Sequence, residues 1–474
     1  MTILPALLPA LVLGVGGMVL LLLGVLAKKS NATPAVTVGA ILLLLIAAVL
    51  SWTAPDVQLF QGLFKTSLFT RYADTLVYIG SIAALILSFD YNKREKIARF
   101  EYPILVLFAV LGMVVMLSAN DMMGLYVGFE LQSLALYVCA ALARDSVRSS
   151  EAGLKYFVLG ALASGLLIYG ISLVYGFAGT TNFQALAGVF QNGVAGKGTI
   201  VGVVFVLVGL AFKISAAPFH MWAPDVYEGA PSSVTALFAT APKVAAMALL
   251  VSVMAGPFGH LVEQWRLLIV ILSALSMIIG GLAGILQSNI KRLLAYSSIG
   301  HIGYALMGLA VGTVAGVQST LVYIAIYVVM SFGAFACVVA MRRKGHAVEQ
   351  ISDLAGLAGE RPAFALAFAI LLWSMAGIPP LFGFFAKLYV FATAINGGLD
   401  VLSAIGIITA VFSAFYYLRV IKVMYFDKGT PSFDKAPLGV GFLMGLSAFV
   451  AIFFIVVPGP LMSVAGAAAK ALMG

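Results

Sequence analysis

The feature that most constrains this chain is a series of apolar stretches, each long enough to cross a bilayer as a helix. A hydrocarbon core of roughly 30 Å needs about 20 apolar residues in helical form. The continuous Leu, Ala, Val and Gly runs have no period of two, which excludes a porin-like barrel. The sequence therefore predicts an all-α, polytopic membrane protein of about fourteen transmembrane helices, at 4–26, 34–52, 68–89, 102–119, 121–142, 152–177, 199–222, 230–255, 266–287, 291–311, 315–341, 362–394, 401–426 and 438–464.

The composition excludes several classes of protein. The chain is 62% hydrophobic and only 9% charged, so it is too apolar for a soluble protein of several domains. Its net charge of +9 comes from short basic clusters between apolar runs, which indicate membrane topology rather than nucleic-acid binding. Cys139 and Cys337 lie in apolar runs without a CxxC pattern, so neither a disulfide framework nor a metal site is expected.

The basic residues also predict the orientation. Lys and Arg gather in alternate loops, beginning with Lys28 and Lys29 and continuing at 93–99 and 342–344, whereas the opposite loops hold few. The richer side should be cytoplasmic, which places both termini on the outer side. No basic residue precedes the first apolar run and two follow it, so we expect a membrane anchor there and not a cleaved signal.

Three ionisable residues lie deep inside predicted spans. Lys213 is roughly 13 Å or more from either end of its span, Lys243 about 20 Å from the inner end and Glu130 about 12 Å from the outer end. A lysine side chain reaches only about 6 Å, so these lysines cannot extend to the interface. Each ionised group near the midplane costs roughly 2.5–3.5 kcal/mol, which something must offset.

Three physical arrangements can offset that cost: pairing Glu130 with a lysine, hydration of an internal cavity, or loss of the lysine proton. All three are used in proton paths, while the alternative interpretation is that these groups are polar packing contacts. Lys155 lies only about four residues into its span, so it can also have a purely positional role at the interface. Lys387 lies about seven residues from the outer end of its span, with the same two interpretations.

Prolines break two spans near a lysine. Pro218 follows Lys213 in span seven, and Pro379 and Pro380 precede Lys387 in span twelve, where they remove backbone donors. An odd number of crossings separates the two spans, so they run in opposite directions. This is the pattern of two inverted five-helix repeats with function at the broken helices. We predict four parts: an N-terminal three-helix segment (1–100), the first repeat (101–260), the second repeat (261–430) and a C-terminal helix 14 (431–474).

Two histidines are further candidates for proton transfer. His220 follows the break in span seven, and His301 lies about halfway along span ten, close to Ser297 and Ser298. An imidazole there can relay protons, although a neutral core histidine is the alternative. No P-loop is present and no soluble segment exceeds about twenty residues, so we expect no nucleotide, flavin or iron–sulfur cluster in this chain.

Four stretches carry a family resemblance: GFELQSLALYV, FKISAAPFHMWAPDVYEGAPSSVTALFATAPKVAA, KRLLAYSSIGHIGYALMG and MAGIPPLFGFFAKLYV. Together they resemble the subunit N family of the proton-pumping NADH:quinone oxidoreductase, respiratory complex I, over essentially the whole chain. The stretch HMWAPDVYEGAP is specific for this family, since the sister subunits L and M and the Mrp-type antiporters usually differ after the histidine. Fourteen spans resemble the bacterial form, which lies in the inner membrane.

The resemblance implies roles for five residues. The glutamate that the family carries in span five falls on Glu130, the span-six lysine on Lys155, and the lysines of the broken helix, span eight and span twelve on Lys213, Lys243 and Lys387. It further implies a proton channel driven by quinone chemistry elsewhere in the complex. NADH, FMN, the iron–sulfur clusters and quinone would then bind to partner subunits, and the other membrane subunits, including the sister antiporter-like subunits, would be its partners.

The positions of the buried residues and the family resemblance together give a mechanistic hypothesis. Glu130 stabilises Lys213 as an ammonium, and a shift in that ion pair sends its proton along a hydrated chain. Lys243 and His301 relay the proton, and Lys387 is the donor on the outer side. The alternatives are a subunit of a Na⁺ (or K⁺)/H⁺ antiporter without redox coupling, a scaffolding subunit, and a relative that takes electrons from ferredoxin.

Overall fold

The computed structural model describes residues 3–27, 32–429 and 433–474. Within this part of the chain, thirteen helices are long and apolar enough to cross a membrane. Two shorter apolar helices, α16 (Pro362–Ala376) and α17 (Phe382–Asn396), make the fourteenth crossing. The predicted all-α fold of about fourteen transmembrane helices is confirmed. Lys28 and Lys29, on which part of the predicted topology rests, lie outside the described residues.

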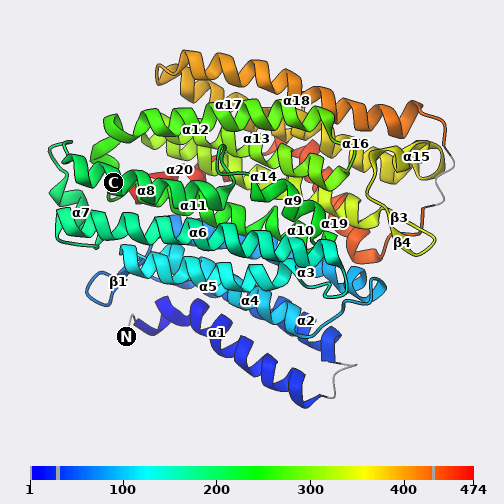
Figure 1. The fold of residues 1–474 in the computed structure, drawn as a ribbon, viewed down its shortest axis with the longest axis horizontal. Helices are drawn as coiled ribbons and strands as arrows, with labels where there is room; N and C mark the ends of the chain where they lie inside the picture. Colours follow the sequence, from blue (N-terminus) through cyan, green and yellow to red (C-terminus); the bar gives the residue numbers. More distant parts are fainter. Residues whose placement is uncertain (1–2, 28–31, 430–432) are drawn as a thin grey trace.

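The first two helices lie at one edge of the bundle, and the third packs between them and the interior (Figure 1). Ser67 caps the third of them, with its side chain accepting from the backbone N–H of Thr70. A short antiparallel hairpin precedes this cap and lies at the same end of the bundle as both termini (Figure 1). The elements of this segment are α1 (Ile3–Leu26), α2 (Ala32–Thr53), β1 (Val57–Leu59), β2 (Phe64–Thr66) and α3 (Leu68–Arg94).

The next five crossings correspond to the predicted first repeat. Its fourth and fifth members are each divided in two by an interruption of the helix. The helices are α4 (Glu101–Ser118), α5 (Met122–Ala140), α6 (Val147–Ala178), α8 (Lys197–Ile214) with α9 (Trp222–Gly229), and α10 (Ser232–Phe238) with α11 (Ala241–Ala255); the short α7 (Phe183–Val189) joins α6 to α8.

The following five crossings correspond to the second repeat, and a second hairpin lies at the end of the bundle opposite the termini (Figure 1). The elements are α12 (Val262–Ala283), α13 (Ile290–Ala310), α14 (Val314–Ala340), β3 (Arg342–Arg343), β4 (His346–Ala347), α15 (Leu357–Glu360), α16, α17 and α18 (Asp400–Phe426). Short 3-10 turns occur at Gly259–Leu261, Gly284–Leu286 and Ile351–Leu354.

The two repeats share local details. Asp121 caps α5 and pairs with Asn182 in an isolated β-bridge, while Asn289 caps α13 and pairs with Gln350 in the same way. An odd number of crossings separates α5 from α13, so the two caps lie at opposite ends of the bundle, which we name the β1–β2 end and the β3–β4 end. This repetition with inverted direction is the arrangement that the two broken spans predicted.

Helices within each repeat approach closely at glycines. A Cβ atom added at Gly280 of α12 would lie 2.4 Å from the backbone nitrogen of Gly300 in α13. In the first repeat, a Cβ atom at Gly112 of α4 would lie 2.4 Å from the nitrogen of Gln132 in α5. Small residues permit this approach in membrane bundles, where van der Waals packing replaces the hydrophobic effect.

The structure adds two interruptions that the sequence did not predict. The last crossing bends between α19 (Leu438–Phe453) and α20 (Gly459–Met473), where a 3-10 turn at Phe454–Val456 precedes Pro458 and Pro460. Span eight is interrupted at Ala239 and Thr240, just before Pro242 at the start of α11. In both places a proline removes a backbone donor and ends the preceding helix.

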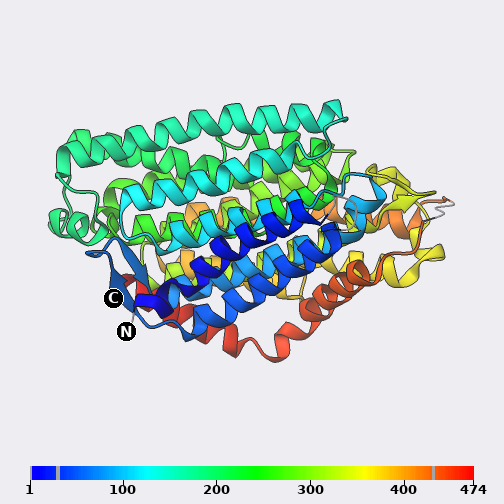
Figure 2. The same cartoon turned by 90° about the horizontal axis from the view of Figure 1, so that it is seen from below.

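The core is formed by the helices in the interior of the bundle. The crossing α10–α11 and the helices α13 and α14 are buried almost throughout, whereas α1, α2 and α19 are largely exposed. Figure 2 shows α6 and the α19–α20 crossing at opposite sides of the bundle. Lys213, Lys243, His301 and Lys387 are between 2% and 5% exposed, so each side chain points into this core and none faces lipid.

Candidate functional site

The break in span seven exposes a backbone carbonyl that a buried lysine binds. In a continuous helix the N–H of residue 218 would bond to the carbonyl oxygen of Ile214, four residues earlier. Pro218 has no N–H, and α8 ends at Ile214. The Nζ of Lys243 donates to this carbonyl oxygen at 3.1 Å and lies 5.7 Å from the centre of the Tyr227 ring. Lys243 therefore replaces the donor that the proline lacks.

The break in span twelve repeats this chemistry. Pro379 and Pro380 cannot donate to the carbonyls of Met375 and Ala376, which are the last two residues of α16. The Nζ of Lys387 donates to both oxygens, at 3.1 Å and 2.8 Å. A cation at the carbonyl end of a helix is also favoured by the helix dipole. At the breaks in spans seven and twelve, each carbonyl left without a donor by Pro218, Pro379 or Pro380 is thus bound by a buried ammonium.

Lys213 sits one residue before the first break in an aromatic chamber. Its Nζ donates to the hydroxyl oxygen of Ser133 at 2.6 Å, and Ser133 in turn donates to the carbonyl oxygen of Phe129 at 2.6 Å. The rings of Phe129, Tyr137 and Tyr156 lie 4.9, 5.7 and 5.7 Å from the Nζ. The faces of aromatic rings attract a cation, which lowers the cost of holding an ammonium away from water.

Glu130 is half-buried on α5, one turn before Ser133. Ser164 of α6 donates a hydrogen bond to the Glu130 carboxylate, and the Tyr126 hydroxyl lies 3.1 Å from the Ser164 oxygen. Neither Glu130 nor Lys213, both within the described residues, forms an ion pair within 4.0 Å. The direct ion pair of the sequence-based hypothesis is therefore wrong for this conformation. Two serine hydroxyls occupy the contacts that the carboxylate and the ammonium were expected to make with each other.

His301 lies at the centre of a cluster of tyrosines in the second repeat. Its Nδ1 is 2.8 Å from the hydroxyl of Tyr323, and its Nε2 is 3.3 Å from that of Tyr417. Tyr417 also shares a hydrogen bond with Ser297, and Tyr327 donates to Ser298. Both ring nitrogens are thus engaged with hydroxyls, which can act as donor or acceptor.

The buried candidates form two neighbouring pairs. Lys243 binds the carbonyl of the residue that follows Lys213, so both lysines meet at the break in span seven. His301 and Lys387 share Tyr304, since its ring centre is 6.4 Å from the imidazole and 4.9 Å from the Lys387 Nζ. Tyr227 extends from the first pair to the second repeat, where its ring packs against Phe335 of α14 at 6.3 Å.

The His220 side chain forms no hydrogen bond with either pair among the described residues. It belongs to the segment between α8 and α9, flanked by the exposed Pro218 and by Met221, which is 68% exposed. Its Nδ1 is buried without a hydrogen-bond partner among the described residues. His220 is therefore partly exposed at the break and is not hydrogen-bonded to the other candidates in the described part of the chain.

Lys155 belongs to a network of charges at the β3–β4 end. It forms ion pairs of 2.8 Å with Glu151 and with Asp225, and its side chain is 42% exposed. This exposure fits the interfacial position predicted for it. Asp225 also pairs with Arg292 of α13 at 2.7 Å, so α9 is held by both repeats. Burial raises the pKa of Asp225, but the contacts with Lys155 and Arg292 outweigh it and hold this pKa below its usual range.

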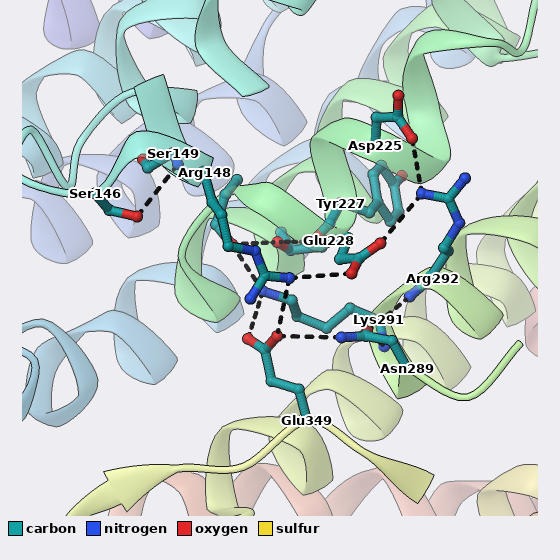
Figure 3. Close-up of polar contacts among 12 residues, drawn as sticks. Ser146, Arg148, Ser149, Asp225, Tyr227, Glu228, Asn289, Lys291, Arg292 and Glu349 are labelled. Carbon is teal, nitrogen blue, oxygen red and sulfur yellow. Dashed lines mark hydrogen bonds and ion pairs between the residues drawn. The ribbon is translucent and has the colours of Figure 1, made fainter. Parts of the chain in front are cut away.

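Further ion pairs at the β3–β4 end extend this network. Arg292 pairs with Glu228 at 3.1 Å, Glu228 with Arg148 at 3.0 Å, and the buried Lys291 with Glu349 at 2.6 Å (Figure 3). Cavities of about 510 Å³ and 130 Å³ lie against these side chains. The sequence reasoning missed these charges because they lie in short loops and helix ends, where solvated residues are the ordinary expectation.

Other residues of the site that were not predicted have a recognisable pattern in the sequence. Ser133 lies three residues after Glu130, which puts both on one helical face. The three carbonyls bound by Lys243 and Lys387 all stand four residues before a proline, a spacing that the sequence displays. Among residues 3–27, 32–429 and 433–474, no group of three or more His, Cys, Asp or Glu side chains can hold a metal ion.

Comparisons with known proteins bear on the family of the chain. The family described as NADH:quinone oxidoreductase/Mrp antiporter, TM matches residues 119–413. NADH-quinone oxidoreductase subunit N 1 of Acidiphilium cryptum is 59% identical over 98% of each chain. A chain of respiratory complex I from Thermus thermophilus is 31% identical with a TM-score of 0.83, covering 96% of this chain and 98% of that one. A chain of the Mrp complex from Dietzia sp. has a TM-score of 0.88 over the whole of both chains but is 22% identical, which shows the fold alone.

Proposed function

Because the chain belongs to the subunit N family of NADH-quinone oxidoreductase, we propose that its buried lysines and histidine carry protons from the cytoplasm to the outer side. The chain is an antiporter-like membrane subunit of this proton-translocating enzyme, respiratory complex I, and its partners are the other membrane subunits. It is a multi-pass protein of the bacterial inner membrane. The antiporter alternative has only the shared fold in its favour.

One observation carries the proposal: four titratable groups lie in the core of a membrane protein, each against a polar partner and none against lipid. Lys213 contacts Ser133, Lys243 contacts a carbonyl, His301 contacts two tyrosines and Lys387 contacts two carbonyls. Ionisable groups at such depth are expensive, and they mark proton and ion pathways. A scaffold could fill these positions with neutral hydrogen-bonding side chains at lower cost.

The proposed path begins at the β3–β4 end, which we take as cytoplasmic because its loops carry the basic clusters. The network of Lys155 and Asp225 lies beside the cavities there and admits protons to the first repeat. Lys213 and Lys243 pass the proton across the break, His301 relays it, and Lys387 releases it toward the β1–β2 end. Both termini then lie on the outer side.

In this path Glu130 acts through hydroxyls. Ser164 holds its carboxylate and Ser133 holds the Lys213 ammonium, so rotation of these hydroxyls or a small shift of α5 changes how strongly the carboxylate stabilises the ammonium. Neighbouring subunits, driven by quinone chemistry, would produce this shift. His220, partly exposed at the break, is a candidate for contact with such a neighbour and not for the central relay.

We also propose a division of the chain into four parts. We propose the three-helix segment 1–100, the repeats 101–260 and 261–430, and the final part 431–474; the matching caps of α5 and α13 support the two repeats. We further propose that NADH, FMN, the iron–sulfur clusters and quinone bind only to partner subunits, while members of this family belong to a complex whose cofactors sit in other subunits.

The test uses the assembled complex in proteoliposomes. Lys213→Met and Glu130→Gln should leave the amount of assembled complex unchanged and reduce proton uptake, because each removes a titratable group from the path. Lys470→Met, at an exposed position near the end of α20, is the matched control and should pump like the parent. Parent rates of proton uptake in both path variants would refute the proposal.

A further inference from the structure

A groove runs along the outside of the first repeat at the β3–β4 end. It has a volume of about 580 Å³ and lies between α4, α5 and α6. Apolar side chains line it, including Leu105, Val138, Leu154 and Phe157. Val138, Leu154 and Phe157 are 56%, 62% and 49% exposed, so this wall faces out of the chain at the depth of the membrane. The groove offers an apolar surface to a long, flexible hydrocarbon.

Two arginines lie at the loop end of the groove. Arg99 precedes α4 and Arg144 follows α5, so both are at the boundary between the helices and the loops. Both are exposed, and across residues 3–27, 32–429 and 433–474 no carboxylate lies within 4.0 Å of either guanidinium. One acidic residue, Glu101, also lines the groove. Guanidinium groups bind phosphate by paired N–H donors, and basic pockets between helices at this depth suit anionic lipid head groups.

The floor of the groove is the wall of the Lys213 chamber. Tyr137 lines the groove, and the centre of its ring is 5.7 Å from the Lys213 Nζ. Phe157 packs edge-on against Tyr137 with ring centres 5.7 Å apart. Only one layer of aromatic side chains therefore separates the ammonium from the surface of the chain on this side.

From these contacts we propose that the groove binds an anionic phospholipid. Arg99 and Arg144 hold its phosphate, and an acyl chain covers Tyr137 and Phe157. A helix of a neighbouring subunit is the poorer occupant, because an apolar helix would bury the two arginines without an acceptor. The acyl chain keeps water out of the Lys213 chamber from the membrane side, so that protons reach Lys213 only along the internal path. This second part rests on the proposed function of Lys213.

Lipid retention tests the binding directly. The complex carrying Arg99→Gln and Arg144→Gln is purified in detergent, and its phospholipids are quantified by native mass spectrometry. The affinity for phosphatidylglycerol should fall about thirtyfold, the effect of two arginines near an anionic head group. The matched control is Lys93→Gln with Arg94→Gln, two basic residues that do not line the groove. Leu154→Trp, which fills the groove without a change in charge, should also release the lipid.

Unchanged phosphatidylglycerol retention in the double variant, or a neighbouring subunit found in the groove of the assembled complex, would overturn the binding site. The consequence for pumping is read separately, as protons taken up per quinone reduced in proteoliposomes. The parent should lose part of this ratio in pure phosphatidylcholine and regain it with phosphatidylglycerol, while the double variant stays low in both. A double variant that loses its lipid but keeps the parent ratio would overturn the sealing role alone. Failure of the proposed function would show independently, in Lys213→Met.

Discussion

Replacing Lys387 separates a structural role of this lysine from proton transfer. Its ammonium binds the two carbonyls that Pro379 and Pro380 leave without donors, so a merely structural account needs only a hydrogen-bond donor at this place. Lys387→Gln keeps an N–H donor that cannot carry a proton, and Lys387→Met is apolar and of similar length. Only Lys387→Gln can still donate to the two carbonyls, whereas both variants lack the titratable ammonium group.

The expected effect on stability is modest. Lys387→Met leaves two buried carbonyls without a donor, at about 1–3 kcal/mol each. It also removes an ionisable group whose placement near the midplane costs roughly 2.5–3.5 kcal/mol. The two effects largely offset each other, so the net loss should stay below about 4 kcal/mol and the complex should assemble. A positioned acid–base group accelerates proton transfer by about 10²-fold or more, and both variants lose this contribution.

The assay is proton uptake by proteoliposomes that contain the purified complex, with NADH-driven quinone reduction measured in parallel. Both variants should pump far more slowly than the parent, and the melting temperature of Lys387→Gln should exceed that of Lys387→Met. The control is Lys422→Met, because the Lys422 side chain is 63% exposed on α18. Parent pumping in Lys387→Gln would show that Lys387 is only a helix cap and would refute the reasoning.

Three further changes test other parts of the account. Ser133→Ala removes the acceptor of the Lys213 ammonium, a hydrogen bond of about 1.5–3 kcal/mol, and proton uptake should fall about tenfold; an unchanged rate would remove Ser133 from the path. Asp225→Asn should lower the melting temperature by the same amount at pH 5 and pH 8. The pKa of Asp225 is lowered in the folded state, so its contribution to stability is fully present at any pH above the unfolded pKa of about 3.9 and is lost only as the pH falls through the folded pKa. A smaller difference at pH 5 than at pH 8 would contradict this. Gly280→Ala should cost about 1–3 kcal/mol because its Cβ would meet backbone at 2.4 Å, whereas Gly441→Ala, with open space around it, should be neutral in the same thermal unfolding experiment.

The sequence predicted the transmembrane helices and the breaks in spans seven and twelve for a simple reason. Hydrocarbon requires long apolar helices, and Pro218 and Pro379 each lie inside an apolar run close to a buried lysine, which indicated these two breaks. Proline alone is not sufficient, because Pro9 lies inside the continuous helix α1 and the break before Pro242 was not predicted. The bend between α19 and α20 also lies beside prolines, but at the end of a span, where a proline ordinarily terminates a helix. Composition alone cannot distinguish these two cases.

The partners of the buried groups were harder to predict. Helical periodicity places Glu130 and Ser133 on one face of α5, but only the packing of α5 against α8 decides which of them Lys213 reaches. The network of Asp225 and Arg292 joins residues that are 67 positions apart, a contact that depends on how the repeats dock. Periodicity within one helix carries no such information.

Proton uptake by inverted membrane vesicles that carry Lys243→Met tests the central claim most directly, because Lys243 stands at the break where the first repeat meets the rest of the proposed path. The measurement compares proton uptake with quinone reduction at equal amounts of assembled complex. Proton transfer along the buried groups predicts a large loss of uptake, beyond any loss explained by assembly. Vesicles with normal complex content that acidify at the parent rate would contradict it.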